Sequence, residues 1–237
     1  HQRMLLRPFH ARFFSTVVPR PILSYTPFLS KRALARNPSA IRALQPLLSE
    51  PGMISLGGGM PNPSTFPFEA IQVTLSDAQK TTFALKNKEL EQVLQYSGTR
   101  GIDPLLEHLY QLQLKEHGQV QPKKFEICVT TGSQDALTKA FDLFTGAGGD
   151  EPPMLVEEPT YSGSLAYLQP TGTRLVGIEC DENGLIPHVL RSTLANWDQE
   201  NAHQPRPKVL YTIPSGSNPT GKAGNQQCFL TKRLSSQ

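Results

Sequence analysis

The chain has 237 residues, of which 38% are apolar, and a mean hydropathy of −0.34. This length suffices for one large domain or two small ones, and no uninterrupted apolar run approaches the ~20 residues of a membrane helix, which argues against a transmembrane protein. The cysteines Cys128, Cys180 and Cys228 show neither C-x-x-C spacing nor a His/Cys ligand pattern, so we expect a reducing compartment, no disulfide framework and no metal site.

Residues 1–35 form a basic leader. The net charge is +3, yet eight Lys and Arg residues precede Glu50, the first acidic residue, so the rest of the chain is mildly acidic. The arginines of the leader alternate with Leu, Phe and Val, which is typical of a mitochondrial transit peptide. A disordered basic tail, or translated sequence upstream of Met4, would look the same, so both a mitochondrial and a cytoplasmic location stay open. The leader also contains four prolines and no consistent period, so we expect the fold to begin near Arg36.

Residues 36–68 are rich in proline and glycine, which predicts an irregular arm with one short helix around residues 39–48. The first strong helix is expected after it, where Asp103 can cap the helix, Pro104 suits its first position and Gly118 follows its end. Apolar residues recur there at the spacing of a helix that buries one face: Ile102, Leu105, Leu106, Leu109 and Leu112.

Strands and helices then alternate. Residues 125–129 predict a strand that leads through a tight turn into a helix over 133–144, whose expected buried face is Ala136, Leu137, Ala140, Phe141 and Phe144. The alternation continues with further strands at 153–159, 173–180 and 208–214, and with helices at 160–168 and 186–197. This order predicts an α/β fold with a mostly parallel sheet and right-handed crossovers.

Ligands of such sheets bind at the carboxyl ends of the strands, so the turns that leave the strands are the candidate site. The first turn runs from Thr130 to Gln134. Amides at the positive end of the following helix attract phosphate, and the Ser133 hydroxyl can donate a further hydrogen bond. A serine that merely caps its helix would give the same short pattern.

Two further turns carry candidate ligand residues. Tyr161 directly follows a strand end, where its ring could stack on a planar ligand or pack on the next helix. Asn218 lies in a turn-rich segment, residues 214–221, where its amide could reach the polar edge of a ligand, although an ordinary surface loop has the same composition. The glycines 57–59 lack the strand-turn-helix context of a nucleotide-binding cluster.

In this order, the segments resemble the fold-type I (class I/II) aminotransferases, and among them the kynurenine/α-aminoadipate aminotransferase group. The likeness runs from about Ala35 to Gly221 and rests on ARNPSAIR, MISLGGGMPNPSTFPF, LQYSGTRGIDPLLEHL, TTGSQDAL, EEPTYSG, DENGLIP and YTIPSGSNPTG. It implies a three-layer α/β sandwich, the cofactor pyridoxal 5′-phosphate (PLP), and homodimers. The implied reaction moves an amino group from an aromatic amino acid, kynurenine or 2-aminoadipate to a 2-oxo acid. Neither a nucleic acid nor a membrane is expected as a partner.

The resemblance also implies roles for single residues. Ser133 and Gln134 would hold the cofactor phosphate. Tyr161 would stack on the pyridine ring, and Asn218 would donate a hydrogen bond to the phenolic oxygen of that ring. These roles agree with the physical interpretation of the three turns.

Three more roles follow from the resemblance alone. Tyr96 would reach the cofactor phosphate of the neighbouring subunit, Gly59 would line the substrate site, and Arg42 would belong to a mobile arm over the pocket. The implied division of the chain is a leader (1–35), an N-terminal arm with part of a small domain (36–100), the first part of the PLP-binding large domain (101–221) and an aberrant or truncated tail (222–237).

The chain departs from the family pattern after Gly221. Family members continue with a helix, an Asp that pairs with the pyridinium nitrogen, and the Schiff-base lysine. Neither Lys222 nor Lys232 has the context of that lysine, so we expect no catalytic residue in this chain and almost no turnover by it alone. The alternative is a non-catalytic PLP-binding or regulatory subunit that pairs with a full-length homologue. A DNA-binding regulator is a distant third, because the leader has no helix-turn-helix pattern.

Overall fold

The computed structural model describes residues 22–37, 39–44, 46–47, 50–54, 56, 59–117, 125–146 and 151–224. The chain divides into two compact units, called here the sheet unit (residues 1–35 with 137–237) and the arm unit (residues 36–136). The division falls inside helix α5 (Ser133–Phe144), whereas the expected boundary lies between residues 100 and 101.

The sheet unit is built on four described strands: β3 (Met154–Glu158), β4 (Leu175–Asp181), β5 (Gly184–Leu185) and β6 (Val209–Tyr211). Their order is β5-β4-β3-β6. Both β4 and β6 run parallel to β3, and the short β5 runs antiparallel to β4. The predicted α/β fold with a mostly parallel sheet is confirmed.

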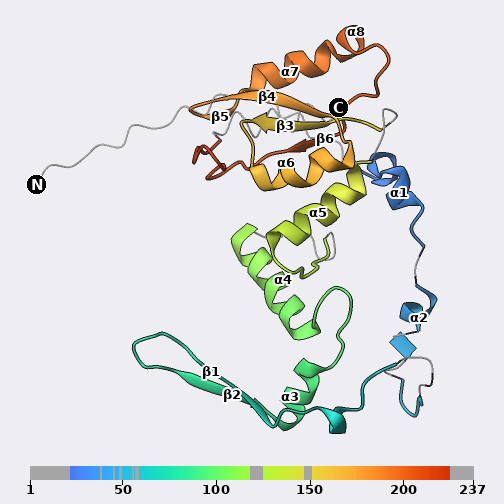
Figure 1. Cartoon of the computed structure of the whole chain (residues 1–237), viewed down its shortest axis with the longest axis vertical. Helices are drawn as coiled ribbons and strands as arrows, with labels where there is room; N and C mark the ends of the chain where they lie inside the picture. Colours follow the sequence, from blue (N-terminus) through green and yellow to red (C-terminus); the bar gives the residue numbers. More distant parts are fainter. Residues whose placement is uncertain are drawn as a thin grey trace, which may run out of the picture. The chain divides into compact units, whose positions relative to one another are not determined.

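Helices cover both faces of this sheet. In Figure 1, α6 (Ser162–Leu168) lies on one side, and α7 (Pro187–Ala195) and α8 (Trp197–Glu200) lie on the other. Side chains of β3 alternate between the two sides, as successive residues of a strand do. Two buried clusters result: Phe141, Met154, Val156 and Leu168 towards α5 and α6, and Leu155, Ile178, Leu185 and Leu190 towards α7. The sheet unit is therefore a three-layer sandwich.

The N-terminal segment of the sheet unit packs against α5 through Ser30. It contains the short helices η1 (Thr26–Phe28) and α1 (Lys31–Leu34). Ser30 is 1% exposed; its hydroxyl donates to the carbonyl oxygen of Asp142 (3.0 Å) and accepts from the amide of Ala33 (3.1 Å). The side chain thus caps α1 and also joins it to α5.

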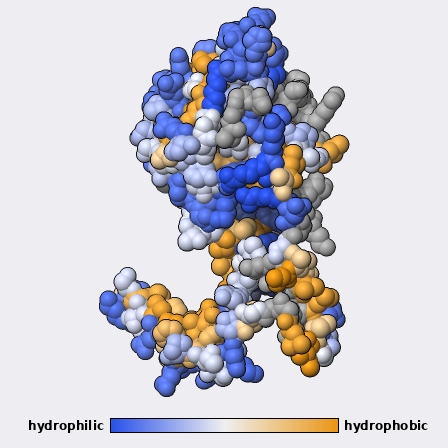
Figure 2. All heavy atoms as spheres, turned by 45° about the vertical axis from the view of Figure 1, so that its right-hand side comes forward, coloured by the Kyte–Doolittle hydropathy of each residue, from blue (hydrophilic) through white to orange (hydrophobic). Residues whose placement is uncertain are grey.

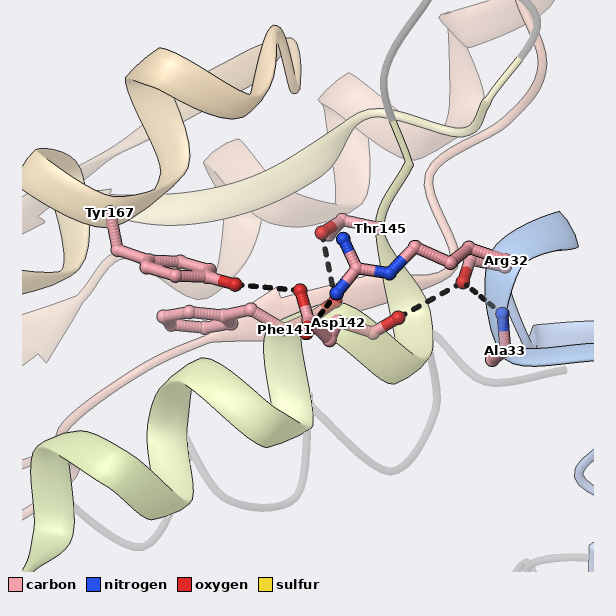
Figure 3. A network of polar contacts seen from close by, with 7 residues as sticks. Arg32, Ala33, Phe141, Asp142, Thr145 and Tyr167 are labelled. Atoms are coloured by element: carbon pink, nitrogen blue, oxygen red, sulfur yellow. Dashed lines mark hydrogen bonds and ion pairs between the residues drawn. The ribbon is translucent and has the colours of Figure 1, made fainter. Parts of the chain in front are cut away.

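The carboxylate of Asp142 holds the same segment from α5. It pairs with Arg32 and accepts a hydrogen bond from the Tyr167 hydroxyl at 2.6 Å (Figure 3). The expectation that the fold begins near Arg36 is therefore wrong for residues 22–35. Helices of three and four residues are too short to produce a hydrophobic period, and Pro27 lies in the first turn of η1, where proline is tolerated. Residues 1–21, where most of the transit-peptide pattern falls, lie outside the described residues.

The arm unit contains a β-hairpin and several helices: α2 (Ala40–Ala43), η3 (Pro63–Thr65), β1 (Ala70–Thr74), β2 (Thr82–Lys86), α3 (Asn87–Leu94) and α4 (Asp103–His117). The strands of the hairpin pair antiparallel, from Ala70 opposite Lys86 to Thr74 opposite Thr82. The predicted short helix is confirmed as α2 and the strong helix as α4. The hairpin and α3 were not predicted.

Two predictions for the arm unit are wrong. Residues 125–129 form no strand, and no described strand pairs with them in a hydrogen-bond ladder. Their Val129 amide donates instead to the carbonyl of Arg100 (2.7 Å), and Phe125 stacks on Tyr110 with ring centroids 5.1 Å apart. The apolar stripe of α4 is also not buried; Leu112, for example, is 46% exposed.

The hairpin carries hydrophobic side chains on its surface. Four of them are between 36% and 50% exposed: Ile71, Val73, Leu75 and Phe83. In Figure 2, hydrophobic residues occupy much of the visible surface in the lower part of the view, which contains the hairpin. Contiguous exposed apolar surface of this kind is typical of a face that another chain covers.

The stability of the hairpin loop is expected to depend on pH through Asp77. Thr81 donates its amide (2.8 Å) and its hydroxyl (2.6 Å) to the Asp77 carboxylate. These hydrogen bonds favour the charged form and hold the pKa of Asp77 below its ordinary value. The loop is therefore expected to be fully stabilised above the ordinary pKa of aspartate and to loosen as the pH falls through the lowered, folded-state pKa.

A titration of the carboxyl chemical shift of Asp77 checks this expectation. Thr81→Val removes the hydroxyl donor, so the pKa of Asp77 should move up towards its ordinary value. A pKa that stays equally low in this variant would show that the hydroxyl contributes nothing.

Candidate cofactor site

Tyr161 and Asn218 follow the ends of two neighbouring strands. The last backbone pair between β3 and β6 joins Val156 to Tyr211, and both strands run in the same direction. The loop with Tyr161 leaves β3 after Glu158, and the loop with Asn218 leaves β6 after Tyr211. Because the carboxyl ends of parallel strands meet at one edge, both loops start from the same edge of the sheet, where ligands of α/β folds bind.

The ring of Tyr161 lies against the first turn of α6. A Cβ atom added at Gly163 would come within 2.5 Å of the Tyr161 ring carbons Cε1 and Cζ and within 2.6 Å of its hydroxyl oxygen. Glycine therefore leaves the space that the ring occupies. The ring is half-buried, so part of it remains accessible. The sequence left open whether Tyr161 packs on the next helix or stacks on a ligand, and this position is compatible with both.

Asn218 is exposed at the tip of a turn that hydrogen bonds hold on both sides. The Ser217 amide donates to the carbonyl of Lys222 at 2.7 Å, and the Gly221 amide donates to the carbonyl of Ser217 at 2.5 Å. Gly216 precedes the turn with a φ of +61°, a conformation that favours glycine. The Asn218 amide is thus presented to solvent from a fixed backbone.

Glu157 is the residue of this site that the sequence analysis missed. Its side chain is 4% exposed and accepts three hydrogen bonds from the segment that follows β6. The donors are the Thr212 hydroxyl, the Ile213 amide (3.3 Å) and the Ser217 hydroxyl (3.3 Å). The signal was an acidic residue one place inside the end of an apolar strand, where alternation points it inward beside Leu155.

Ser133 and Gln134 begin α5 and are exposed, as a phosphate-binding turn requires. Gly132 has a φ of +89° with open space around it, so the tight turn is confirmed. The Asp135 carboxylate accepts from the Thr131 amide (3.0 Å), which places a negative charge in the first turn and weakens the attraction of this helix end for anions. These residues lie in the arm unit, and their grouping with Tyr161 and Asn218 stays a prediction.

The other predicted site residues also lie in the arm unit. Tyr96 is 68% exposed. Its amide donates to the side-chain oxygen of Gln95 (2.9 Å), whose side-chain nitrogen donates to the carbonyl of Pro61 (2.8 Å). Gln95 therefore links the start of the Tyr96 loop to the glycine-rich arm, in which Gly59 is exposed. Arg42 belongs to α2. The roles of Tyr96, Gly59 and Arg42 stay predictions.

Other kinds of site find no support among the described residues. No group of three or more His, Cys, Asp or Glu side chains there could hold a metal ion. No described helix combines the length and apolar character needed to cross a membrane. A cavity of about 490 Å³ between the hairpin and α3, lined by Phe66, Phe68 and Leu90 among others, contains none of the predicted site residues. Lys222 is half-buried beside the Asn218 turn, and Lys232 lies outside the described part of the chain.

Known proteins with a similar sequence or fold are aminotransferases, although no protein-family model matches the chain. The mitochondrial kynurenine/alpha-aminoadipate aminotransferase of Bos taurus is 38% identical over 212 residues, which cover 85% of this chain and 49% of the relative. Aminotransferase Aro8 of Candida albicans has a TM-score of 0.77 and 28% identity, covering 88% of this chain and 46% of that structure.

A further solved structure is the kynurenine aminotransferase of Pyrococcus horikoshii in complex with PMP. It has a TM-score of 0.53 and 29% identity, covering 86% of this chain and 46% of its own. The chain thus spans about half the length of the relatives that it matches. Over most of its own length it agrees with them in both sequence and fold, and the chain is therefore a relative of the kynurenine/α-aminoadipate aminotransferases.

Proposed function

We propose that the chain supplies the cofactor-binding loops of a PLP-dependent aminotransferase. The substrates would be an aromatic amino acid, kynurenine or 2-aminoadipate, together with a 2-oxo acid. The observation that carries the proposal is the start of the Tyr161 and Asn218 loops from one edge of a parallel sheet, at adjacent strands. The relatives named above support the reaction class.

The donor set fits the cofactor. PLP is a flat ring with a phenolic oxygen and a phosphate, and when bound it supplies the electron sink that transamination needs. Tyr161 would bind one face of the ring and Asn218 would donate to the phenolic oxygen. Ser133 and Gln134 would bind the phosphate through a hydroxyl and backbone amides. Each of these residues orients the ring, and none of them is proposed to react.

The assembly and the location are further parts of the proposal. The exposed apolar face of the hairpin supports a homodimer, in which Tyr96 would reach the phosphate of the partner's cofactor, Gly59 would line the substrate site and Arg42 would lie over the pocket. The mitochondrial name of the Bos taurus relative and the Arg-rich leader favour a mitochondrial location over a cytoplasmic one.

Calorimetric titration of the 237-residue chain with pyridoxamine phosphate (PMP) tests the proposal, because this amine form needs no lysine to bind. We expect saturable binding at one site per chain. Asn218→Ala should weaken it about three- to tenfold, the usual net effect of one hydrogen bond. The exposed Asn183 lies in a different turn, so Asn183→Ala is the matched control and should leave the affinity unchanged. No saturable binding by the wild-type chain would overturn the proposal.

The lysines provide a second arm of the same experiment. We propose that neither Lys222 nor Lys232 bonds covalently to PLP. Borohydride reduction of the chain mixed with PLP should therefore leave both lysines unmodified in peptide mass spectra. A non-catalytic PLP-binding or regulatory subunit would give the same result, namely two unmodified lysines together with intact PMP binding. Labelling of either lysine would show that the chain carries its own covalent lysine.

A further inference from the structure

Glu157 is a buried carboxylate with no described cation beside it. All three of its hydrogen bonds come from neutral donors, on Thr212, Ile213 and Ser217. A buried charge is costly unless hydrogen bonds satisfy it, and hydrogen bonds to a charged acceptor are stronger than those between neutral groups. The arrangement therefore binds the segment after β6 firmly to the end of β3.

These contacts begin where the backbone ladder stops. The last pair of the ladder is Val156 with Tyr211, so Glu157 is the next residue on β3 and Thr212 is the first residue after β6. Beyond that point the side chain of Glu157, in place of the backbone, joins the end of β3 to the segment after β6 by hydrogen bonds. It reaches Ser217, whose own side chain is buried at 8% exposure and whose backbone closes the turn with Lys222 and Gly221.

The residue next to Ser217 is Asn218. We propose that Glu157 is a positioning residue for Asn218: by fixing Ser217 and the start of its loop, the carboxylate sets where the exposed Asn218 amide points. Glu157 also lies just before the loop that leads from β3 to Tyr161. A single side chain therefore fixes the Asn218 loop relative to the Tyr161 loop. The role in ligand binding rests on the proposed function, whereas the fixing of the loop does not.

Glu157→Ala removes all three acceptor contacts, and Glu157→Gln keeps one carbonyl oxygen that can accept from Ile213 and Ser217. In the ligand-free chain, amide hydrogen exchange of residues 212–222 should rise about tenfold in the alanine variant and only slightly in the glutamine variant, while exchange of β4 stays unchanged. Glu179→Ala on β4 is the matched control, because Glu179 is exposed. Unchanged exchange of 212–222 in Glu157→Ala would overturn the proposal.

A double-mutant cycle with PMP separates positioning from general stability. Glu157→Ala should weaken PMP binding about as much as Asn218→Ala does, and the two changes together should weaken it no further, because both act through one contact. Effects that simply multiply would refute positioning through Asn218. Ser217→Ala removes one loop contact only, and it replaces Glu157→Ala if that variant does not fold. If the wild-type chain binds no PMP, the proposed function fails, and the exchange experiment still decides the loop connection.

Discussion

Gly163→Ala is expected to weaken PMP binding about tenfold, a change of about 1.4 kcal/mol, without lowering the free energy of unfolding. A Cβ atom at this position would lie 2.5 Å from the Tyr161 ring, so the ring must move away from the first turn of α6. The ring is the far end of a side chain and can rotate at low cost. Alanine also favours a helix over glycine by up to about 1 kcal/mol. Calorimetry and urea unfolding measure the two quantities separately.

Two Tyr161 variants control this experiment. Tyr161→Phe keeps the ring and should bind PMP almost as well as the wild type, whereas Tyr161→Ala should match the loss in Gly163→Ala. Full PMP affinity in Gly163→Ala would contradict a role for the Tyr161 ring in its present position.

Ile178→Ala is expected to lower the free energy of unfolding of the sheet unit by about 2–5 kcal/mol. Ile178 is 0% exposed in β4 and packs with Leu155, Leu185 and Leu190 between the sheet and α7. Shortening the Ile178 side chain to alanine removes apolar contacts and leaves a cavity that the surrounding residues cannot fill. The only tryptophan, Trp197, is 1% exposed in the same unit, so its fluorescence during urea unfolding reports this loss directly.

A graded series makes the stability result specific. Ile178→Val should lower the free energy of unfolding by only about 0.5–1.5 kcal/mol. Ile71→Ala, at a 36% exposed position of the hairpin, should have little effect on the Trp197 transition. Equal losses in Ile178→Ala and Ile71→Ala would mean that burial in β4 is not what stabilises the sheet unit.

The elements that could be predicted from the sequence are those whose buried side chains leave a recognisable pattern of apolar residues. Strands β3, β4 and β6 carry apolar runs bounded by turn formers, and α6 and α7 follow them within a few residues. Residues 125–129 have an equally apolar sequence, yet a strand needs a neighbour for its ladder, and pairing cannot be deduced from one segment. The hairpin was missed because its two short strands are exposed, although AIQVT and TFALK alternate weakly.

Part of the geometry of the candidate site could also be predicted. Turn formers after strand ends pointed to Tyr161 and Asn218, and the structure starts both loops from one edge of the sheet. Glu157 was not found, because its hydrogen bonds come from three donors that lie about 55 to 60 residues further along the chain. The contact of Ser30 with Asp142 was missed for the same reason, since these residues are 112 positions apart.

A crystal structure of the chain with PMP bound tests the central claim most directly. The expected complex has the pyridine ring against Tyr161, its phenolic oxygen within hydrogen-bond distance of the Asn218 amide, and its phosphate at the turn of Ser133 and Gln134. PMP bound elsewhere, or a structure in which Tyr161 and Asn218 contact no common molecule, would contradict the account.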